Sequence, residues 1–147
     1  MFVVDASVYI ADMRPSEPHH PAARAFMDRM RQSGKPVYGP IVVLAEIAGG
    51  LARGTGRPDL AHRQIGLLQR FPNFVFVPVD EALGQLAAET AATHQIRGCD
   101  ALYVALAQQL DATLVTLDAE QRQRGLAVVI TQTPEAALGT IDTLDQV

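Results

Sequence analysis

Short apolar runs alternate along the chain with longer segments in which apolar residues recur at helical spacing. The apolar runs predict five strands, at residues 2–5, 36–39, 74–78, 113–117 and 126–130. Strands that alternate with helices at these intervals are typical of a parallel sheet with helices on both faces. Because no linker, internal repeat or low-complexity stretch interrupts this alternation, we expect an α/β fold in a single domain with a central parallel sheet of about five strands.

The segments between these runs carry the start and stop signals of helices. Pro18 and Pro21 precede apolar positions at helical spacing, and Gly34 ends that helix. Pro40 is expected in the first turn of the next helix, where its missing N–H costs nothing, and Asp80 as the N-cap of a long one. The expected helices are a helical start at 6–11, the helix that ends at 34, and helices at 41–53, 60–68, 80–95, 100–110 and 118–124, with a loop at 54–58. The tail, residues 134–147, has room for one short helix and is assigned to the same domain as residues 1–133.

Composition narrows the class of protein. The 147 residues are 48% apolar and 19% charged, which predicts a folded domain with a substantial core. No apolar run is long enough to span a bilayer and the first residues lack the basic region of a signal peptide, so we expect a cytoplasmic protein with no membrane partner. Cys99 is the only cysteine, which excludes an internal disulfide and a cysteine-rich zinc site.

Three aspartates occupy positions where a sheet of this kind binds ligands. Asp5 and Asp118 each follow an apolar strand, and open α/β sheets bind ligands beyond the carboxyl ends of their strands. Asp100 opens an apolar helix. Each of the three is also explained as a helix N-cap, most strongly Asp118, because Gln121 three residues later completes a capping box. For Asp100 the alternative is a cap at residues 98–99, with Asp100 already in the first turn.

Glu46 is harder to explain as a structural residue. It is the one charge in the apolar and glycine-rich segment 41–52, which predicts a helix buried nearly all round. A buried carboxylate is costly unless a cation, a hydrogen-bond network or protonation relieves it. We favour a metal or active-site role for Glu46 over the alternative, a buried salt bridge to Arg53 or Arg97.

Carboxylates gathered in one place suit a particular chemistry. Mg²⁺ and Mn²⁺ prefer oxygen ligands, and clustered carboxylates raise their own pKa values unless a cation neutralises them. Such an ion orients a phosphate and activates water, as phosphodiester hydrolysis requires. The net charge of −4 excludes binding of nucleic acid by broad positive charge alone but not an RNA substrate, since bound cations reverse the local charge. Ser7 and Thr116 are candidates for supporting hydrogen bonds, with helix capping as the alternative role. Arg97 is a candidate for phosphate binding, with an ordinary surface arginine as the alternative. Tyr103 is assigned to the core.

The four acids lie in sequence blocks that resemble the PIN-domain family, in particular the VapC-type toxin ribonucleases of bacterial toxin–antitoxin pairs. The blocks are Val-Val-Asp-Ala-Ser at 3–7, Leu-Ala-Glu-Ile at 44–47, Arg-Gly-Cys-Asp-Ala-Leu-Tyr-Val-Ala-Leu-Ala at 97–107 and Leu-Val-Thr-Leu-Asp at 114–118. They occur in the family's order and span nearly the whole chain.

The resemblance implies a five-stranded parallel sheet and an endoribonuclease that depends on Mg²⁺ or Mn²⁺. It implies that one metal-binding and catalytic quartet is formed by Asp5, Glu46, Asp100 and Asp118. It also implies a homodimer inhibited by a cognate antitoxin protein, a segment of which occupies the active-site groove. Many members carry a further acid or Asn shortly after the fourth acid, and here Glu120 is the candidate.

Other functions remain as alternatives. A haloacid-dehalogenase-like phosphatase needs a second Asp where this chain has Ser7, and a receiver domain needs a late lysine, whereas Lys35 is early. Two alternatives within the resemblance are a non-catalytic PIN-like binding module with structural acids and a housekeeping PIN nuclease without an antitoxin. We expect a ribonuclease, the toxin of a type II toxin–antitoxin pair.

Overall fold

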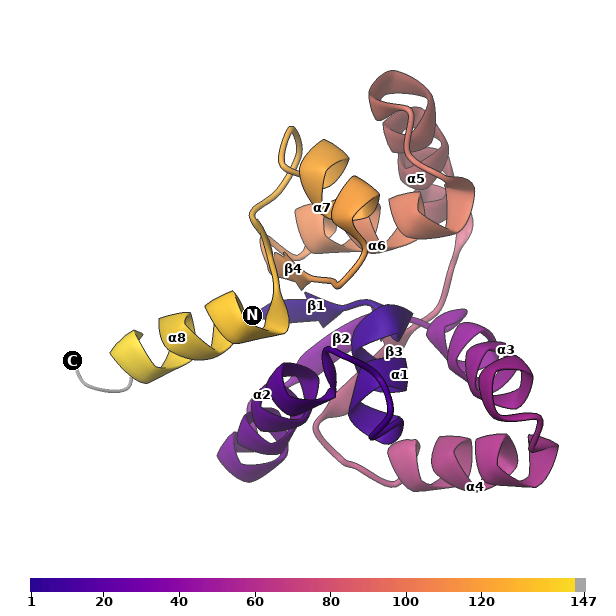
Figure 1. Ribbon diagram of the computed structural model, residues 1–147. Coiled ribbons are helices and arrows are strands. Elements are labelled where there is room, and N and C mark those ends of the chain that lie inside the picture. The colour runs from indigo at the N-terminus through magenta and orange to yellow at the C-terminus, as the bar shows by residue number, and fades with distance from the viewer. Residues whose placement is uncertain (145–147) are drawn as a thin grey trace.

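A computed structural model describes residues 1–144 as a five-stranded parallel sheet covered by helices on both faces (Figure 1). Every strand pairing is parallel, which confirms the predicted α/β fold. The strands are β1 (Phe2–Val4), β2 (Val37–Pro40), β3 (Phe74–Val77), β4 (Thr113–Val115) and β5 (Thr131–Gln132). The helices are α1 (Ala6–Met13), α2 (His20–Ser33), α3 (Val43–Thr55), α4 (Pro58–Leu68), α5 (Glu81–His94), α6 (Gly98–Gln109), α7 (Ala119–Gly125) and α8 (Pro134–Leu144).

The sheet extends from β1 in both directions, first through β2 and β3 on one side and then through β4 and β5 on the other. The strand order is β3-β2-β1-β4-β5, so the connection from β3 to β4 passes over β2 and β1. The switch point of the topology therefore lies between β1 and β4, where sheets of this class bind ligands. The register places Val4 beside Val115, so the residues that follow these two strands emerge next to each other.

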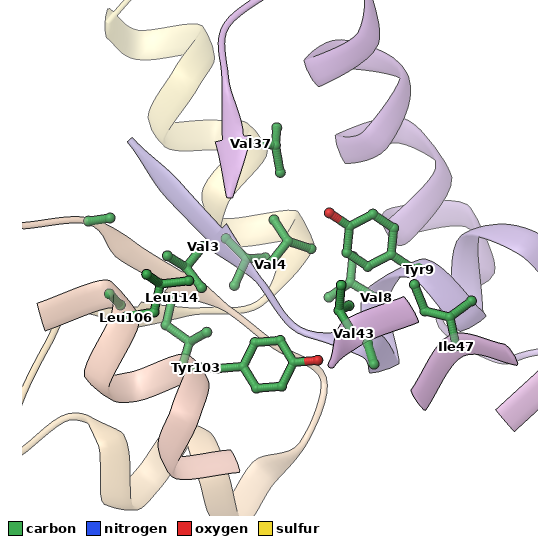
Figure 2. Close-up of a cluster of buried hydrophobic side chains, with 14 of the residues drawn as sticks. Val3, Val4, Val8, Tyr9, Val37, Val43, Ile47, Tyr103, Leu106 and Leu114 are labelled. Carbon is green, nitrogen blue, oxygen red and sulfur yellow. The ribbon is translucent and has the colours of Figure 1, made fainter. Parts of the chain in front are cut away.

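The central strands are buried because both faces of the sheet are covered. Helix α6 contacts β1, β2 and β4 on one face, while α1 and α2 lie on the other (Figure 1). Val3, Val4, Leu106 and Leu114 belong to one fully buried cluster (Figure 2). Strands buried on both faces read as continuous apolar runs rather than alternating ones.

Two boundaries around α3 differ from the sequence prediction. Pro40 ends β2 instead of opening the helix, and α3 begins at Val43. The N–H of Ile41 bonds to Val77 O on β3, so the backbone nitrogen of Pro40, one residue earlier, faces the β1 side. Because β1 has already ended there, no acceptor is left without a donor by the missing N–H of proline. The expected loop at 54–58 is also shorter, because α3 continues to Thr55 and the left-handed residue Gly56 ends it.

The last strand is displaced from the predicted segment 126–130. In that segment the backbone turns, with Val128 N bonded to Gly125 O, and the side chains of Leu126 and Ile130 are 61% and 65% exposed. The strand pairing instead continues through Thr116 N to Gln132 O. The prediction of a strand at 126–130 is therefore wrong, because this apolar run begins as a turn with exposed side chains.

The C-terminal segment forms the helix α8, as the sequence suggested. Ala137 and Ile141 are buried, and α8 contacts α2 and β5. Residues 145–147 of the predicted tail lie outside the described residues. Among residues 1–144, every helix is too short or too polar to cross a membrane.

We predict unequal costs for two leucine substitutions. Leu114→Ala should lower the free energy of unfolding by about 2–5 kcal/mol, because Leu114 is fully buried between the helical layers. Leu126→Ala should change it by less than about 0.5 kcal/mol, because Leu126 lies in the exposed turn. Urea denaturation measures both, and equal costs would place segment 126–130 in the core.

Candidate active site

Asp5 is a buried carboxylate at the end of β1. It is the N-cap of α1, and its Oδ2 accepts the N–H of Ser7 at 2.9 Å. Its backbone N–H bonds to Val115 O at 3.0 Å, which holds it beside the end of β4. The residue is 6% exposed, and no cationic side chain of residues 1–144 pairs with it. Burial raises the pKa of the Asp5 carboxyl, hydrogen bonds from Ser7 and Gln121 lower it in part, and the charge of Asp118 raises it further.

Asp118 combines a cap with an ion pair. Its Oδ1 accepts the backbone N–H of Gln121 at 2.9 Å, so the predicted capping interaction is present. Its Oδ2 binds Arg97. Burial raises the pKa of Asp118, but the hydrogen bonds from Gln121 and Arg97 outweigh it, and the net direction is downward. One oxygen stabilises α7 while the other faces a neighbouring element.

Asp100 lies in the first turn of α6, where the alternative interpretation of the sequence placed it. The N-cap position is Arg97, whose Nε binds Asp100 Oδ2 at 2.7 Å and whose second nitrogen binds Asp118. Burial raises the pKa of Asp100, and the Arg97 guanidinium partly offsets this. The side chain expected to bind phosphate is thus engaged by two of the acids.

Glu46 is only half-buried, contrary to the expectation of a helix buried nearly all round. Helix α3 contacts α4 and α1, and it buries a single stripe, Val43, Ile47 and Leu51. Glu46 Oε2 accepts the hydroxyl of Tyr103, and within residues 1–144 it forms no ion pair with Arg53 or Arg97. The salt-bridge alternative is therefore wrong.

Tyr103 was assigned to the core, and sequence reasoning missed its polar contact. The residue is fully buried, but its ring extends from α6 past the end of β1 with the hydroxyl towards α3 (Figure 2). Burial raises the pKa of Glu46, the Tyr103 hydrogen bond lowers it in part, and the charges of Asp5 and Asp100 raise it. The hydroxyl therefore favours the charged form of Glu46.

Gln121 is a second residue that sequence reasoning missed. It is 1% exposed, and its Nε2 lies 3.3 Å from Asp100 O and 3.5 Å from Asp5 Oδ1. Within residues 1–144 its Oε1 is buried and has no hydrogen-bond partner. The one sequence signal was its place in the capping box, which concerns its backbone N–H and not this side chain.

The predicted supporting residues have structural contacts. Ser7 Oγ accepts the N–H of Leu117 at 3.1 Å and so joins the loops after β1 and β4. Thr116 is fully buried, and its Oγ1 accepts the N–H of Asp118 at 3.0 Å. Glu120, the candidate for a further acid, pairs with Arg124 along α7 at 3.0 Å.

The structure brings the four acids into one region. Asp5, Glu46 and Asp100 line an open hollow of about 510 Å³, and Asp118 is connected to it through Arg97. The charge of Asp5 raises the pKa of both Glu46 and Asp100. Residues separated widely in sequence therefore interact electrostatically at the switch point.

The donor chemistry of this region suits a hard divalent cation. All four acids offer oxygen, Asp5 has no cationic partner among residues 1–144, and Gln121 Oε1 is an unpartnered buried oxygen. In the arrangement described for residues 1–144, however, no three acidic, His or Cys side chains stand close enough to hold a metal ion. Arg97 occupies the carboxylates of Asp100 and Asp118.

Comparisons with known proteins identify the family and the fold. The family model described as PIN domain matches residues 2–126, and no curated protein sequence matches the chain. VapC20 from Mycobacterium tuberculosis, described as a sarcin–ricin loop cleaving toxin, is similar with a TM-score of 0.71 and 21% identity over 85% of this chain and 95% of that chain. FitAcB from Neisseria gonorrhoeae has a TM-score of 0.69 and 23% identity over 91% and 98% of the two chains. VapBC2 from Rickettsia felis, solved with a DNA fragment from its promoter, has a TM-score of 0.68 and 12% identity over 90% and 97%. At such identities the structures establish the fold.

We predict that Asp5→Asn stabilises the metal-free protein. The pKa of Asp5 is raised by burial, so its charge weakens folding above that pKa, and the penalty fades as the pH falls towards 4. Asparagine removes the charge and still caps α1. We therefore expect Asp5→Asn to have a higher unfolding free energy than the parent at pH 7 in urea denaturation with EDTA, and the gain should shrink as the pH is lowered towards 4.

Asp118→Asn is the matched control for this prediction. The pKa of Asp118 is lowered, so its charge supports folding at pH 7 and loses that effect as the pH falls through its pKa. The substitution should therefore destabilise the protein at pH 7. Equal effects of the two substitutions would contradict the assignment of buried, uncompensated charge to Asp5.

Proposed function

Since the chain belongs to the PIN domain family, we propose that it is a metal-dependent endoribonuclease that hydrolyses RNA phosphodiester bonds. The observation that supports this most is the hollow at the switch point, lined by Asp5, Glu46 and Asp100 and connected to Asp118. Like charges gathered in a partly buried site are costly unless a cation offsets them. A non-catalytic module gains nothing from this arrangement.

We assign cation binding to Asp5, Glu46, Asp100 and Asp118. A bound Mg²⁺ or Mn²⁺ supplies charge for the scissile phosphate and lowers the pKa of a water molecule. The protein's own side chains and backbone orient the acids. The N–H of Ser7 orients Asp5, and the hydroxyl of Tyr103 favours the charged form of Glu46 and fixes its position. These donors hold two acids in place on rigid elements.

Arg97 balances the charge of the site from its rim. Its guanidinium binds Asp100 and Asp118, and the side chain is 63% exposed, so it is free to swing away. A cation that binds either aspartate competes with this guanidinium. Before metal and substrate bind, the Arg97 guanidinium would therefore reduce the repulsion between the acids.

We further propose that this ribonuclease is the toxin of a type II toxin–antitoxin pair, with a cognate antitoxin as protein partner. The support is its structural similarity to a VapC toxin and to the VapBC2 assembly. The homodimer implied by the sequence resemblance stays a prediction. A housekeeping nuclease without an antitoxin is the alternative.

RNA cleavage tests the enzymatic proposal. With Mg²⁺ or Mn²⁺ the parent should cleave single-stranded RNA, and Asp5→Asn or Asp100→Asn should reduce the rate by about 100-fold or more, because each removes a charge that holds the cation. Asp59→Asn is the control, since Asp59 is exposed, pairs with Arg57 and does not line the hollow. Parent-like cleavage by both aspartate variants would refute the catalytic assignment.

Metal binding is measurable without catalysis. Millimolar Mg²⁺ or Mn²⁺ should raise the melting temperature of the parent, because binding to the native state at a hundred times Kd adds about 2.7 kcal/mol. Asp5→Asn should lose this shift, whereas Asp59→Asn should keep it, since Asp59 is exposed and paired with Arg57. An unchanged melting temperature of the parent would count against a cation site.

A further inference from the structure

Arg53 lines the same hollow as Arg97. It is in the last turn of α3 and lines the hollow together with Glu46. Residues 46, 49, 50 and 53 are three or four positions apart, so they share one face of the helix. A methyl group on Gly49 would stand 3.0 Å from an Arg53 guanidinium nitrogen. The Arg53 side chain therefore lies back along α3, over the space that Gly49 leaves open, in the direction of Glu46.

The charge of Arg53 is not used by the fold. Within residues 1–144 it forms no ion pair, and its side chain is exposed. Several other arginines among residues 1–144 are paired with carboxylates: Arg14 with Glu17, Arg24 and Arg31 with Asp12, Arg29 with Asp142, Arg57 with Asp59, Arg97 with Asp100 and Asp118, and Arg124 with Glu120. Within the same residues Arg63, Arg70 and Arg122 also form no ion pair, but they do not line the hollow. Among residues 1–144 two arginines line the hollow, and Arg53 is the one without a carboxylate partner there.

An acidic hollow in a chain of net charge −4 repels RNA, so a substrate strand needs positive charge beside the site. Arginine matches a phosphate group with two parallel hydrogen bonds. We propose that Arg53 binds a backbone phosphate of the RNA strand on the Glu46 side of the hollow. This inference rests on the proposed ribonuclease function and adds to it a residue that holds the substrate. The contact is to phosphate and is independent of base sequence.

The test measures RNA binding apart from cleavage. In the Asp5→Asn background, the affinity for a labelled single-stranded RNA is measured by fluorescence anisotropy between 50 and 200 mM salt. Adding Arg53→Ala should weaken binding by about tenfold at the low-salt end and reduce the slope of log Kd against log salt by about 0.7, the loss of one phosphate contact. Arg53→Lys should restore part of the affinity, because it keeps the charge without the planar fork.

Arg70→Ala is the matched control. Arg70 is exposed and precedes β3, at the amino ends of the strands and away from the hollow, so its removal should leave the slope unchanged. In the enzyme that retains Asp5, Arg53→Ala should raise KM by about tenfold with kcat within about twofold, as loss of substrate binding requires.

The outcomes separate the two proposals. Cleavage by the parent together with unchanged RNA affinity and salt slope in Arg53→Ala would overturn this inference alone. An equal loss in Arg70→Ala would also overturn it, since that result reports general attraction and not a contact at the hollow. A parent that neither cleaves nor binds RNA would overturn both proposals.

Discussion

The buried negative charge of Asp5 is the constraint on which the rest of the site depends. The register of β1 and β4 places this carboxylate at the switch point of the sheet, where α1 and α7 enclose it. Burial raises its pKa, and within residues 1–144 its neighbours offer the N–H of Ser7 and the amide of Gln121 but no full positive charge. A buried carboxylate of this kind lowers the free energy of unfolding, a cost that is common at functional sites.

The other acids are compensated in different ways. Arg97 bridges Asp100 and Asp118 with a full charge, whereas Glu46 receives the neutral hydroxyl of Tyr103. An exposed arginine leaves an aspartate readily, but a fully buried tyrosine is held by its packing. Part of the cluster is therefore held by an exposed ion pair and part by a buried hydrogen bond, which suits the exchange of a guanidinium for a cation proposed above.

The cap and site interpretations of the two strand-end aspartates turn out to be compatible. A carboxylate has two oxygens, and in both residues one oxygen accepts the backbone N–H of a helix start. The second oxygen of Asp5 faces Gln121, and that of Asp118 faces Arg97. The same side chain thus stabilises a local element and contributes to a shared region, so a capping motif in sequence is no argument against a functional role.

The sequence by itself determined the alternation of strands and helices, the parallel sheet and the strand-end positions of Asp5 and Asp118, because periodicity, caps and glycine stops act over a few residues. It also contained the motif blocks of the PIN domain. Only the tertiary structure decided that Tyr103 reaches Glu46, 57 residues away, and that Gln121 reaches Asp5, 116 residues away. It likewise decided that, within residues 1–144, Arg97 is engaged by carboxylates and Arg53 is not, and that segment 126–130 begins as a turn rather than a strand. Such contacts depend on which faces pack together across the sheet, and local pattern carries no information on that.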